Sequence, residues 1–226
     1  MFEYSLDFLD RLRVNNNKPW FDAHKGEYLT AKEEFETFAE QLIVGLLEVD
    51  GSVAGLTLKE CTYRFYRDTR FSPDKSPYKT HFGLFVAPRG KKSGYAGYYF
   101  HIEPPKAGYL GGSLLCTGNY RPEPKILKSL REEMLDAGAE FEGAVGRAEG
   151  FRLDESGSLR RTPQGFPTNS PYDRYLRLRD FTLMREVDAD FFGQPNLVER
   201  TVAEYSKTTD FLAIVNRATR YALEEM

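Results

Sequence analysis

The sequence predicts an α+β protein in which a central, mostly antiparallel sheet is flanked by N-terminal and C-terminal helices. Three observations support this fold class. Apolar residues recur with helical spacing in the first 50 residues and again after residue 122. The middle of the chain, residues about 58–115, instead combines aromatic and β-branched residues with turn sequences. A later segment near 181–187, "FTLMREV", alternates like one further strand of the same sheet.

The N-terminal part of the chain predicts two short helices and one long helix. The first takes Ser5 as its N-cap and ends at the asparagine run "NNN", and the second has Pro19 in its first turn. Residues 27–49 show the most regular helical spacing, and Asp50-Gly51 ends that helix. The apolar side chains of its inner face are Phe35, Phe38, Leu42, Leu46 and Val49.

The central part of the chain predicts consecutive antiparallel strands. Turn sequences such as "PRGKKSG" and "EPPKAG" separate segments that are rich in Tyr, Phe, Val and Ile. The expected strands cover residues 58–66, 81–88, 95–103 and 107–115.

Helices are expected to dominate the rest of the chain. Residues 122–136 have helical spacing and a less regular helical pattern follows over 139–150. A connection rich in Gly and Pro then contains a short strand near 158–162. Helices over 195–206 and 210–225 close the chain. Since no long linker interrupts these elements, we expect a single domain over residues 1–226.

Composition narrows the classes of partner. The chain has 226 residues and a formal net charge of −3, which disfavours nucleic acid held by bulk charge. No stretch approaches the roughly 20 apolar residues of a membrane helix, and charges interrupt the N-terminus where a signal peptide needs an apolar run. We therefore expect no membrane partner and a cytoplasmic location. Cys61 and Cys116 lack a zinc-binding spacing, which predicts reduced thiols. The cofactor and the oligomeric state stay open.

Positive charge is concentrated in "RFYRDTRFSPDKSPYKTHFG", residues 64–83. The quartets Ser72–Lys75 and Ser76–Lys79 both fit a type I turn with Pro in its second position. A rigid loop with repeated cations is a suitable cradle for phosphate or carboxylate groups, because Arg offers planar forks and Lys offers point charges. The expected ligand-binding cations are Arg64, Arg67, Arg70, Lys75 and Lys79.

Three residues are candidate proton carriers: Asp68, His81 and His101. If 81–88 and 95–103 form a hairpin, the two histidines lie almost opposite each other, and Glu103 shares a sheet face with His101. Three His and a carboxylate are a set that can bind a divalent metal. Because no compact motif such as HExxH is present, we assign no metal ligand at this stage.

A second wall of the site is expected from "KPWFDAHKGEY", which supplies Trp20 and His24. Tyr78 joins the ligand-binding residues, and so does Glu103, which lies on the wall formed by the two sheet histidines. An aromatic wall that stacks a base is a further interpretation. It would combine Trp20 with Tyr63, Tyr66, Tyr78 and Tyr98.

The leading functional hypothesis is a cationic pocket for an anionic, phosphorylated small molecule. If the protein is an enzyme, phosphoester or acyl-phosphate chemistry fits, because cations stabilise developing negative charge. One alternative is a module that binds single-stranded nucleic acid or a protein, since basic residues alternate with Tyr and Phe. The other alternative is structural: Arg and Asp of the basic segment pair with each other and stabilise the fold.

Together these motifs resemble the uncharacterised bacterial family known as domain of unknown function 2461. The matching stretches are "FLDRLRVNNNKPWFDAHKGEY" (8–28), "RFYRDTRFSPDKSPYKTHFG" (64–83), "GYYFHIEP" (97–104) and "RRTPQGFP" (160–167). The resemblance implies a single α+β domain in a soluble bacterial protein. It implies no reaction, so the site hypothesis depends on the residues alone.

Overall fold

The computed structural model describes residues 1–107 and 109–225, and it confirms the α+β fold class. Five antiparallel strands form one sheet in the order β1-β2-β3-β5-β4. Their bounds are β1 Phe82–Val86, β2 Gly97–Ile102, β3 Leu114–Asn119, β4 Arg152–Leu153 and β5 Phe181–Glu186. The expected strands near 81–88, 95–103 and 181–187 are thus confirmed.

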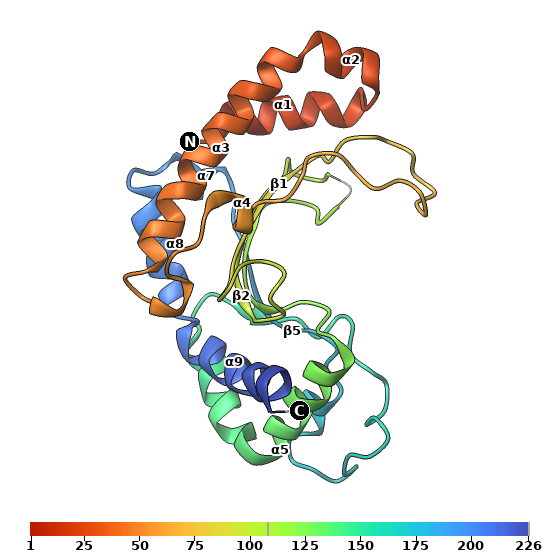
Figure 1. Ribbon diagram of the computed structural model, residues 1–226, viewed down its shortest axis with the longest axis vertical. Coiled ribbons are helices and arrows are strands. Elements are labelled where there is room, and N and C mark those ends of the chain that lie inside the picture. Colours follow the sequence, from red (N-terminus) through yellow and green to blue (C-terminus); the bar gives the residue numbers. More distant parts are fainter. Residues whose placement is uncertain (108, 226) are drawn as a thin grey trace.

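Helices precede, interrupt and follow the sheet (Figure 1). The expected helices over 27–49, 195–206 and 210–225 are confirmed as α3, α8 and α9. The longer helices are α1 Glu3–Val14, α2 Lys18–Ala23, α3 Lys25–Leu46, α5 Pro124–Arg147, α8 Leu197–Ser206 and α9 Thr209–Glu224. The shorter ones are a 3-10 turn at Gly51–Val53, α4 Leu58–Cys61, α6 Asp173–Leu176 and α7 Ala189–Gly193.

One face of the sheet packs against helices and forms the core. Leu84, Phe100 and Leu115 lie opposite one another on β1, β2 and β3, and each is at most 1% exposed. Helix α3 covers this face through Phe38, whose ring centroid lies 4.6 Å from that of Phe100. Tyr205 of α8 covers it further along and donates a hydrogen bond to the Tyr99 carbonyl. Alternation along each strand therefore sends its larger apolar residues toward the helices.

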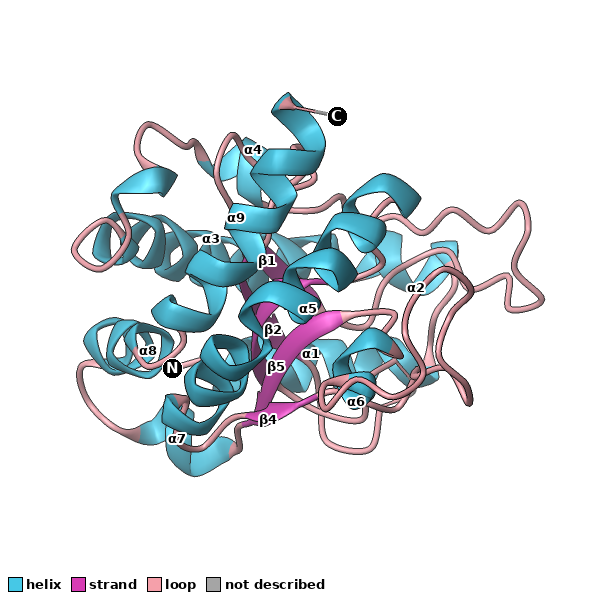
Figure 2. Ribbon diagram, turned by 90° about the horizontal axis from the view of Figure 1, so that it is seen from below, coloured by secondary structure: helices cyan, strands magenta, loops and turns pink. Residues whose placement is uncertain are grey.

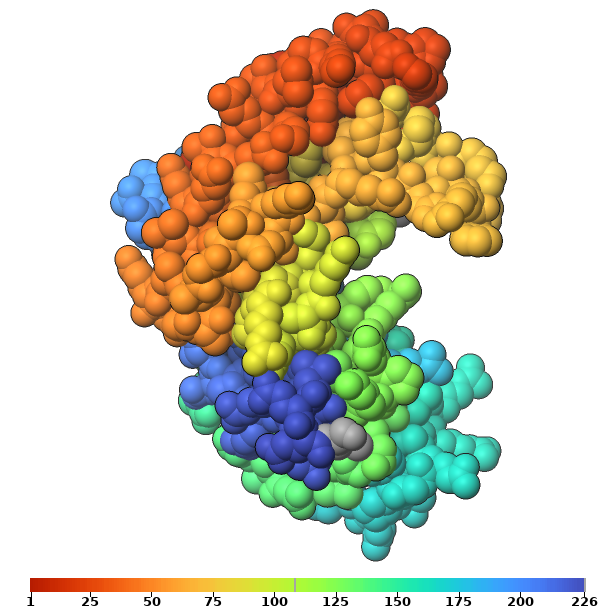
Figure 3. Space-filling view, in the orientation of Figure 1, coloured from red at the N-terminus to blue at the C-terminus, as the bar shows by residue number. Residues whose placement is uncertain are grey.

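The other face of the sheet is only partly covered. Its central row joins Phe85, Tyr99, Cys116 and Met184, which are paired across four strands and remain partly exposed. Figure 2 shows helices α3, α8 and α9 gathered on one side of the magenta strands and most loops on the other. In Figure 3 the surface is hollowed between the segment around residues 67–80, in gold, and the part drawn in green and cyan. The open sheet face lies on this hollow side.

Two of the four strands expected in the central part of the chain are wrong, and residue 108 of the second lies outside the described residues. Residues 58–61 form helix α4, because Thr57 and Glu60 make reciprocal capping hydrogen bonds that start a helical turn. The rest of that segment makes an isolated bridge to the sheet, Thr62 with Leu84, but belongs to none of its strands. The strand expected at 107–115 begins only at Leu114, because Gly111 adopts a φ of +86° and ends any extended run before it.

Other boundaries also differ from expectation. Ser5 lies inside α1, where its buried hydroxyl donates to the Ala31 carbonyl instead of capping the helix. The helical patterns over 122–136 and 139–150 form one helix, α5, with a kink at Ala137. The strand expected near 158–162 does not form, and the short strand β4 lies earlier in the chain. None of the helices in the described residues has the length and apolar character needed to cross a membrane.

Candidate functional site

A pocket of about 290 Å³ lies between α3, α4 and the start of β1. We call it the Lys79 pocket. Four cationic side chains and one carboxylate line it, together with an aromatic wall and one imidazole. The cations are Lys32, Lys59, Arg64 and Lys79, the carboxylate is Glu36, and the imidazole is His81. The lining is therefore strongly positive although the whole chain is acidic.

Lys79 is the central cation of this pocket. Its ammonium is partly buried and lies 5.2 Å from the centre of the Tyr63 ring. Within residues 1–107 and 109–225, no carboxylate oxygen approaches its Nζ to within 4.0 Å. Burial and the nearby charge of Arg64 both lower the pKa of Lys79. Its position is held by a backbone hydrogen bond from its N–H to the Phe65 carbonyl, 3.0 Å long.

The other cations of the pocket differ in how far they are neutralised. Lys32 pairs with Glu36 one helical turn later, at 2.5 Å. Arg64 is exposed and reaches the Asp68 carboxylate only at 3.8 Å. Lys59 belongs to α4 and has no carboxylate partner in the described part of the chain. The charge of Lys79 thus adds to that of Arg64 and Lys59.

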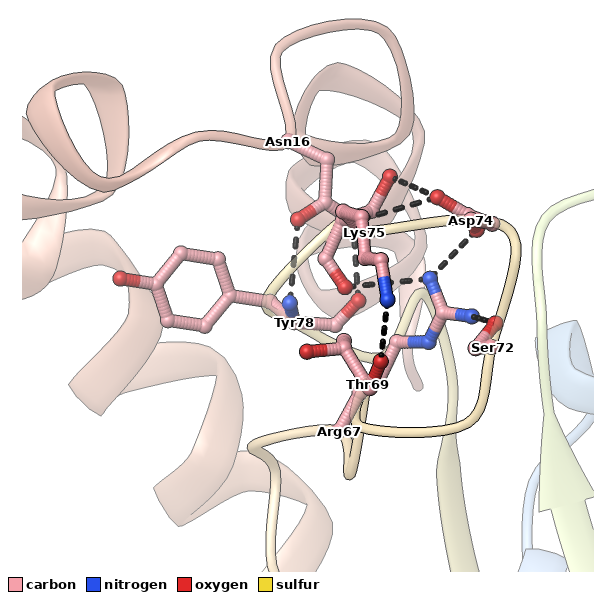
Figure 4. A network of polar contacts seen from close by, with 8 residues as sticks. Asn16, Arg67, Thr69, Ser72, Asp74, Lys75 and Tyr78 are labelled. Carbon is pink, nitrogen blue, oxygen red and sulfur yellow. Dashed lines mark hydrogen bonds and ion pairs between the residues drawn. The ribbon is translucent and has the colours of Figure 1, made fainter.

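The remaining cations of the basic segment, Arg67, Arg70 and Lys75, lie outside the pocket lining. Figure 4 shows that Arg67 and Lys75 make polar contacts within their own loop. The Arg67 guanidinium pairs with Asp74 and donates to the Ser76 carbonyl at 3.1 Å. The Lys75 ammonium donates to the Thr69 carbonyl at 2.9 Å. These contacts stabilise the loop, so Arg67 and Lys75 do not point their charge into the pocket.

Arg70 and Asp68 form a second local pair. The Arg70 guanidinium donates to both carboxylate oxygens of Asp68, at 3.0 and 2.7 Å. These hydrogen bonds lower the pKa of Asp68 to about 2. Hydrogen bonds from Ser76 and then from Arg67 lower the pKa of Asp74 to about 2 as well. Both carboxyls are ionised at neutral pH, and Asp68, expected as a proton carrier, does not line the pocket.

The two Ser-Pro quartets do not form tandem turns. A turn lies earlier, where the Ser72 N–H bonds to the Thr69 carbonyl at 3.3 Å. The second quartet is extended and pairs with the chain before the loop, through a hydrogen bond from the Arg67 N–H to the Pro77 carbonyl. Pairing of the two sides of the loop supplies backbone partners that isolated turns would leave unmatched.

Trp20, His24 and Tyr78 lie outside the pocket lining. Trp20 of α2 stacks on His24, which caps the C-terminal end of that helix, with ring centroids 4.0 Å apart. Tyr78 is 3% exposed, and Asn16 bonds to both its N–H and its carbonyl. Tyr78 also stacks on Phe21 at 4.0 Å. Of the expected aromatic wall, Tyr63 lines the pocket and Tyr66 is exposed, whereas Trp20, Tyr78 and Tyr98 belong to the core packing.

Three sequence-predicted residues do lie together, His81, His101 and Glu103, and of these His81 lines the pocket. We call them the His–Glu cluster. The ring centroids of His81 and His101 are 4.8 Å apart, and Nε2 of His101 lies 3.3 Å from Oε2 of Glu103. His101 and Glu103 are almost fully buried. The expected proximity of the histidines follows from the β1–β2 pairing.

The environment of the cluster keeps both imidazoles neutral. Burial lowers the pKa of His81 to about 3, with smaller effects in the same direction from His101 and Lys79. Burial also lowers the pKa of His101, although Glu103 opposes this shift. Burial disfavours the Glu103 carboxylate, but hydrogen bonds from His101 and two backbone amides outweigh it and lower the pKa.

The loop after β2 positions the cluster. The backbone N–H groups of Tyr109 and Leu110 donate to the two oxygens of Glu103, at 3.0 and 2.8 Å. The Tyr109 ring stacks on His81 with centroids 4.3 Å apart. On the sheet, the Tyr99 hydroxyl lies 2.9 Å from Nδ1 of His101. Among the described residues, Nδ1 of His81 is buried and has no hydrogen-bond partner.

Several site residues were missed from the sequence. Lys32 lies on α3 and Lys59 on α4, both outside the basic segment, and no local pattern connects them to Lys79. Tyr99 could have been found, because the alternation that relates His101 to Glu103 also puts Tyr99 on their face. Tyr109 is brought to His81 by a loop whose path the sequence does not specify.

A larger and more open depression of about 780 Å³ lies beside β4, β5 and α8. Its cations are already neutralised: Arg185 and Lys207 both pair with Glu204. Arg152 at its edge pairs with Glu186. The Lys79 pocket is therefore the better candidate for an anion site.

Comparison with known proteins gives one match. The model of a family described as conserved hypothetical protein (DUF2461) matches residues 4–213. No curated protein and no solved structure matches the chain.

Proposed function

We propose that this chain, which belongs to the DUF2461 family of conserved hypothetical proteins, binds an anionic, phosphorylated small molecule in the Lys79 pocket. The observation that carries the proposal is Lys79 itself. Its ammonium is partly buried and has no carboxylate within 4.0 Å in the described chain. A buried charge without a partner is costly, and a bound anion neutralises it.

The pocket favours a compact ligand group. Its volume of about 290 Å³ lies at the lower end of the range for small-molecule sites. Arg64 offers a planar fork to two phosphate oxygens, and Lys79 and Lys59 offer point charges. Tyr63 gives the same pocket an aromatic side for the remainder of the ligand. These groups suit a phosphomonoester better than a long polyanion.

Ligand binding without a chemical reaction explains the charged lining of the Lys79 pocket with the fewest assumptions. An activity on phosphoesters or acyl phosphates would use the same cations to stabilise developing charge. Of the expected proton carriers, His81 lines the pocket, whereas His101 lies behind it and Asp68 lies outside. His81 is therefore the one of these three residues within reach of a ligand in the pocket.

The proposal is tested by calorimetry and thermal shift with inorganic phosphate and a set of phosphomonoesters. A ligand at 100 times its Kd raises the free energy of unfolding by about 2.7 kcal/mol, which is readily seen as a higher Tm. We expect Lys79→Met and Arg64→Met to weaken binding at least tenfold. Lys75→Met is the matched control, because Lys75 lies in the same segment but outside the pocket. Equal affinities in Lys79→Met and the unmodified protein would refute the proposal.

A second candidate function is binding of single-stranded nucleic acid. Tyr66 and Phe71 are 56% and 94% exposed and alternate with Arg64 and Arg70 along the chain. Exposed aromatic rings between cations can stack bases while the cations contact phosphates. This function predicts oligonucleotide binding that weakens steeply with salt and is reduced by Phe71→Ala. Phosphate binding in the Lys79 pocket is unaffected by that substitution, which separates the two candidates.

A further inference from the structure

We propose that the His–Glu cluster binds one divalent transition-metal ion, for which Zn²⁺ is the best match. One potential ligand atom from each of His81, His101 and Glu103 lies within 4.8 Å of the other two. Two imidazoles and one carboxylate are a ligand set that Zn²⁺ accepts in sites with an open fourth position. This inference does not depend on the binding of a phosphorylated ligand.

The His101–Glu103 pair already has the separation of two zinc ligands. Bonds of about 2.0–2.1 Å in a tetrahedral site put neighbouring ligand atoms roughly 3.3–3.4 Å apart. The distance from Nε2 of His101 to Oε2 of Glu103 is 3.3 Å. An ordinary N–H···O hydrogen bond is shorter, about 2.9 Å. A rotation of the His81 side chain brings the third ligand to the same ion.

His81 also has a buried atom that lacks a partner. In the described chain, its Nδ1 is shielded from solvent and makes no hydrogen bond. Most buried polar atoms in folded proteins are hydrogen-bonded, so an exception calls for a physical cause. A metal ion between His81 and His101 would supply the missing partner. The Tyr109 ring, stacked on His81, covers the imidazole on one side.

The surrounding groups orient the ligands as they do in known metal sites. When Nδ1–H of His101 donates to the Tyr99 hydroxyl at 2.9 Å, the lone pair of Nε2 is free for the ion. The Tyr109 and Leu110 amides hold the two oxygens of Glu103. These contacts come from two different elements, the sheet and the loop after β2, and limit the freedom of both ligands.

The open coordination position lies on the side of the Lys79 pocket. His81 lines that pocket, and so does Gly83, which pairs with His101 across the sheet. His101 and Glu103 are at most 1% exposed, so solvent cannot reach the ion from behind them. A small anion or a water molecule in the pocket can thus become the fourth ligand. Such a water would be activated as a nucleophile.

The test uses chain purified without a histidine tag and freed of metal by a chelator. Zn²⁺ is titrated by calorimetry, and Co²⁺ is followed by its visible absorption, which reports low coordination number. We expect one ion per chain. His81→Ala should weaken binding at least 100-fold. His24→Ala is the matched control, because His24 is the third histidine of the chain and lies outside the cluster.

Two further variants separate a metal site from a merely structural cluster. Tyr99→Phe removes the hydroxyl that orients His101 and should weaken Zn²⁺ binding 10- to 100-fold while the circular dichroism is unchanged. Glu103→Gln keeps the shape of the side chain but removes the anionic ligand and one of the two acceptors for the Tyr109 and Leu110 amides, and should weaken binding similarly. The proposal is overturned if the folded chain binds neither Zn²⁺ nor Co²⁺, or if His81→Ala binds them as tightly as the unmodified chain. Phosphate binding by the metal-free chain tests the Lys79 pocket separately.

Discussion

Gly83 makes room for the hydroxyl of Tyr99. A Cβ atom on residue 83 would lie 2.8 Å from Tyr99 Oη and 3.1 Å from the ring atom Cε2. The same hydroxyl is 2.9 Å from Nδ1 of His101, the residue that pairs with Gly83 across β1 and β2. A glycine on one strand therefore sets the orientation of an imidazole on the next.

Replacing Gly83 by Ala is expected to move the Tyr99 ring and break its hydrogen bond to His101. The lost hydrogen bond should cost about 0.5–1.5 kcal/mol in the free energy of unfolding, measured by denaturant titration. Zn²⁺ affinity should fall at least tenfold. Gly26→Ala is the control, because nothing lies within 4 Å of its Cβ position in α3 and alanine favours a helix. Unchanged Zn²⁺ affinity in Gly83→Ala would show that Tyr99 does not orient His101.

Arg67 is expected to stabilise the loop and not to bind a ligand. It pairs with Asp74 and donates to Ser72 and to the Ser76 carbonyl, and its side chain is only 26% exposed. Arg67→Met should loosen the loop by about 1 kcal/mol, so amide hydrogen exchange in residues 67–79 should be about fivefold faster. Arg70→Met should have a smaller effect, because that side chain is 76% exposed. A loss of phosphate affinity in Arg67→Met, with exchange unchanged, would contradict this assignment.

Cys61 is expected to be unreactive in the folded protein. It is 0% exposed, and burial raises the pKa of its thiol to about 11. At pH 8 its thiolate fraction is then on the order of 0.1%. Burial raises the pKa of Cys116 as well, to about 12. Intact mass after brief iodoacetamide treatment should show no adduct on the native chain and two in guanidinium chloride. Rapid labelling of the native chain would show that the thiols are accessible.

Tyr28, which lines the Lys79 pocket, should make stability depend on alkaline pH. Burial raises its pKa from 10.0 to about 12, so the folded state keeps a proton that the unfolded state loses in this interval. The free energy of unfolding therefore falls as pH rises from 10 toward 12, by at most about 1.4 kcal/mol per pH unit. Tyr28→Phe lacks this contribution. The free energy of unfolding of the unmodified protein should therefore fall relative to that of Tyr28→Phe between pH 9 and pH 11, and a constant difference would contradict burial of the phenol.

Local patterns predicted much of the fold, because interactions between residues close together in the sequence determine most of its helices and strands. The apolar spacing of residues 27–49 predicted α3, aromatic and β-branched residues between turn sequences predicted β1 and β2, and alternation predicted β5. The segment 58–66 failed for an equally local reason: the capping box of Thr57 and Glu60 outweighed β-favouring residues. The pairing of β1 with β2 also explains why His81, His101 and Glu103 could be grouped from the sequence.

The charged groups were harder to assign, because their partners depend on the path of the chain. Arg67 and Arg70 resembled a ligand cradle in the sequence, but Asp74 and Asp68 are close enough along the loop to pair with them. Lys79 instead lines the pocket, where no carboxylate of the described residues reaches it. The three-dimensional path of the chain therefore decides which cation has no carboxylate nearby.

The sequence by itself determined the α+β class, the family, most helices and the strands β1 and β2, because residue spacing and side-chain alternation act over a few residues. Only the tertiary structure decided that Lys32 and Lys59 join Lys79, that Trp20 and Tyr78 belong to the packing and not to the pocket, and that Nδ1 of His81 is left without a partner in the described chain. These outcomes depend on desolvation and on contacts between residues distant in sequence. Both arise only when the helices close on the sheet.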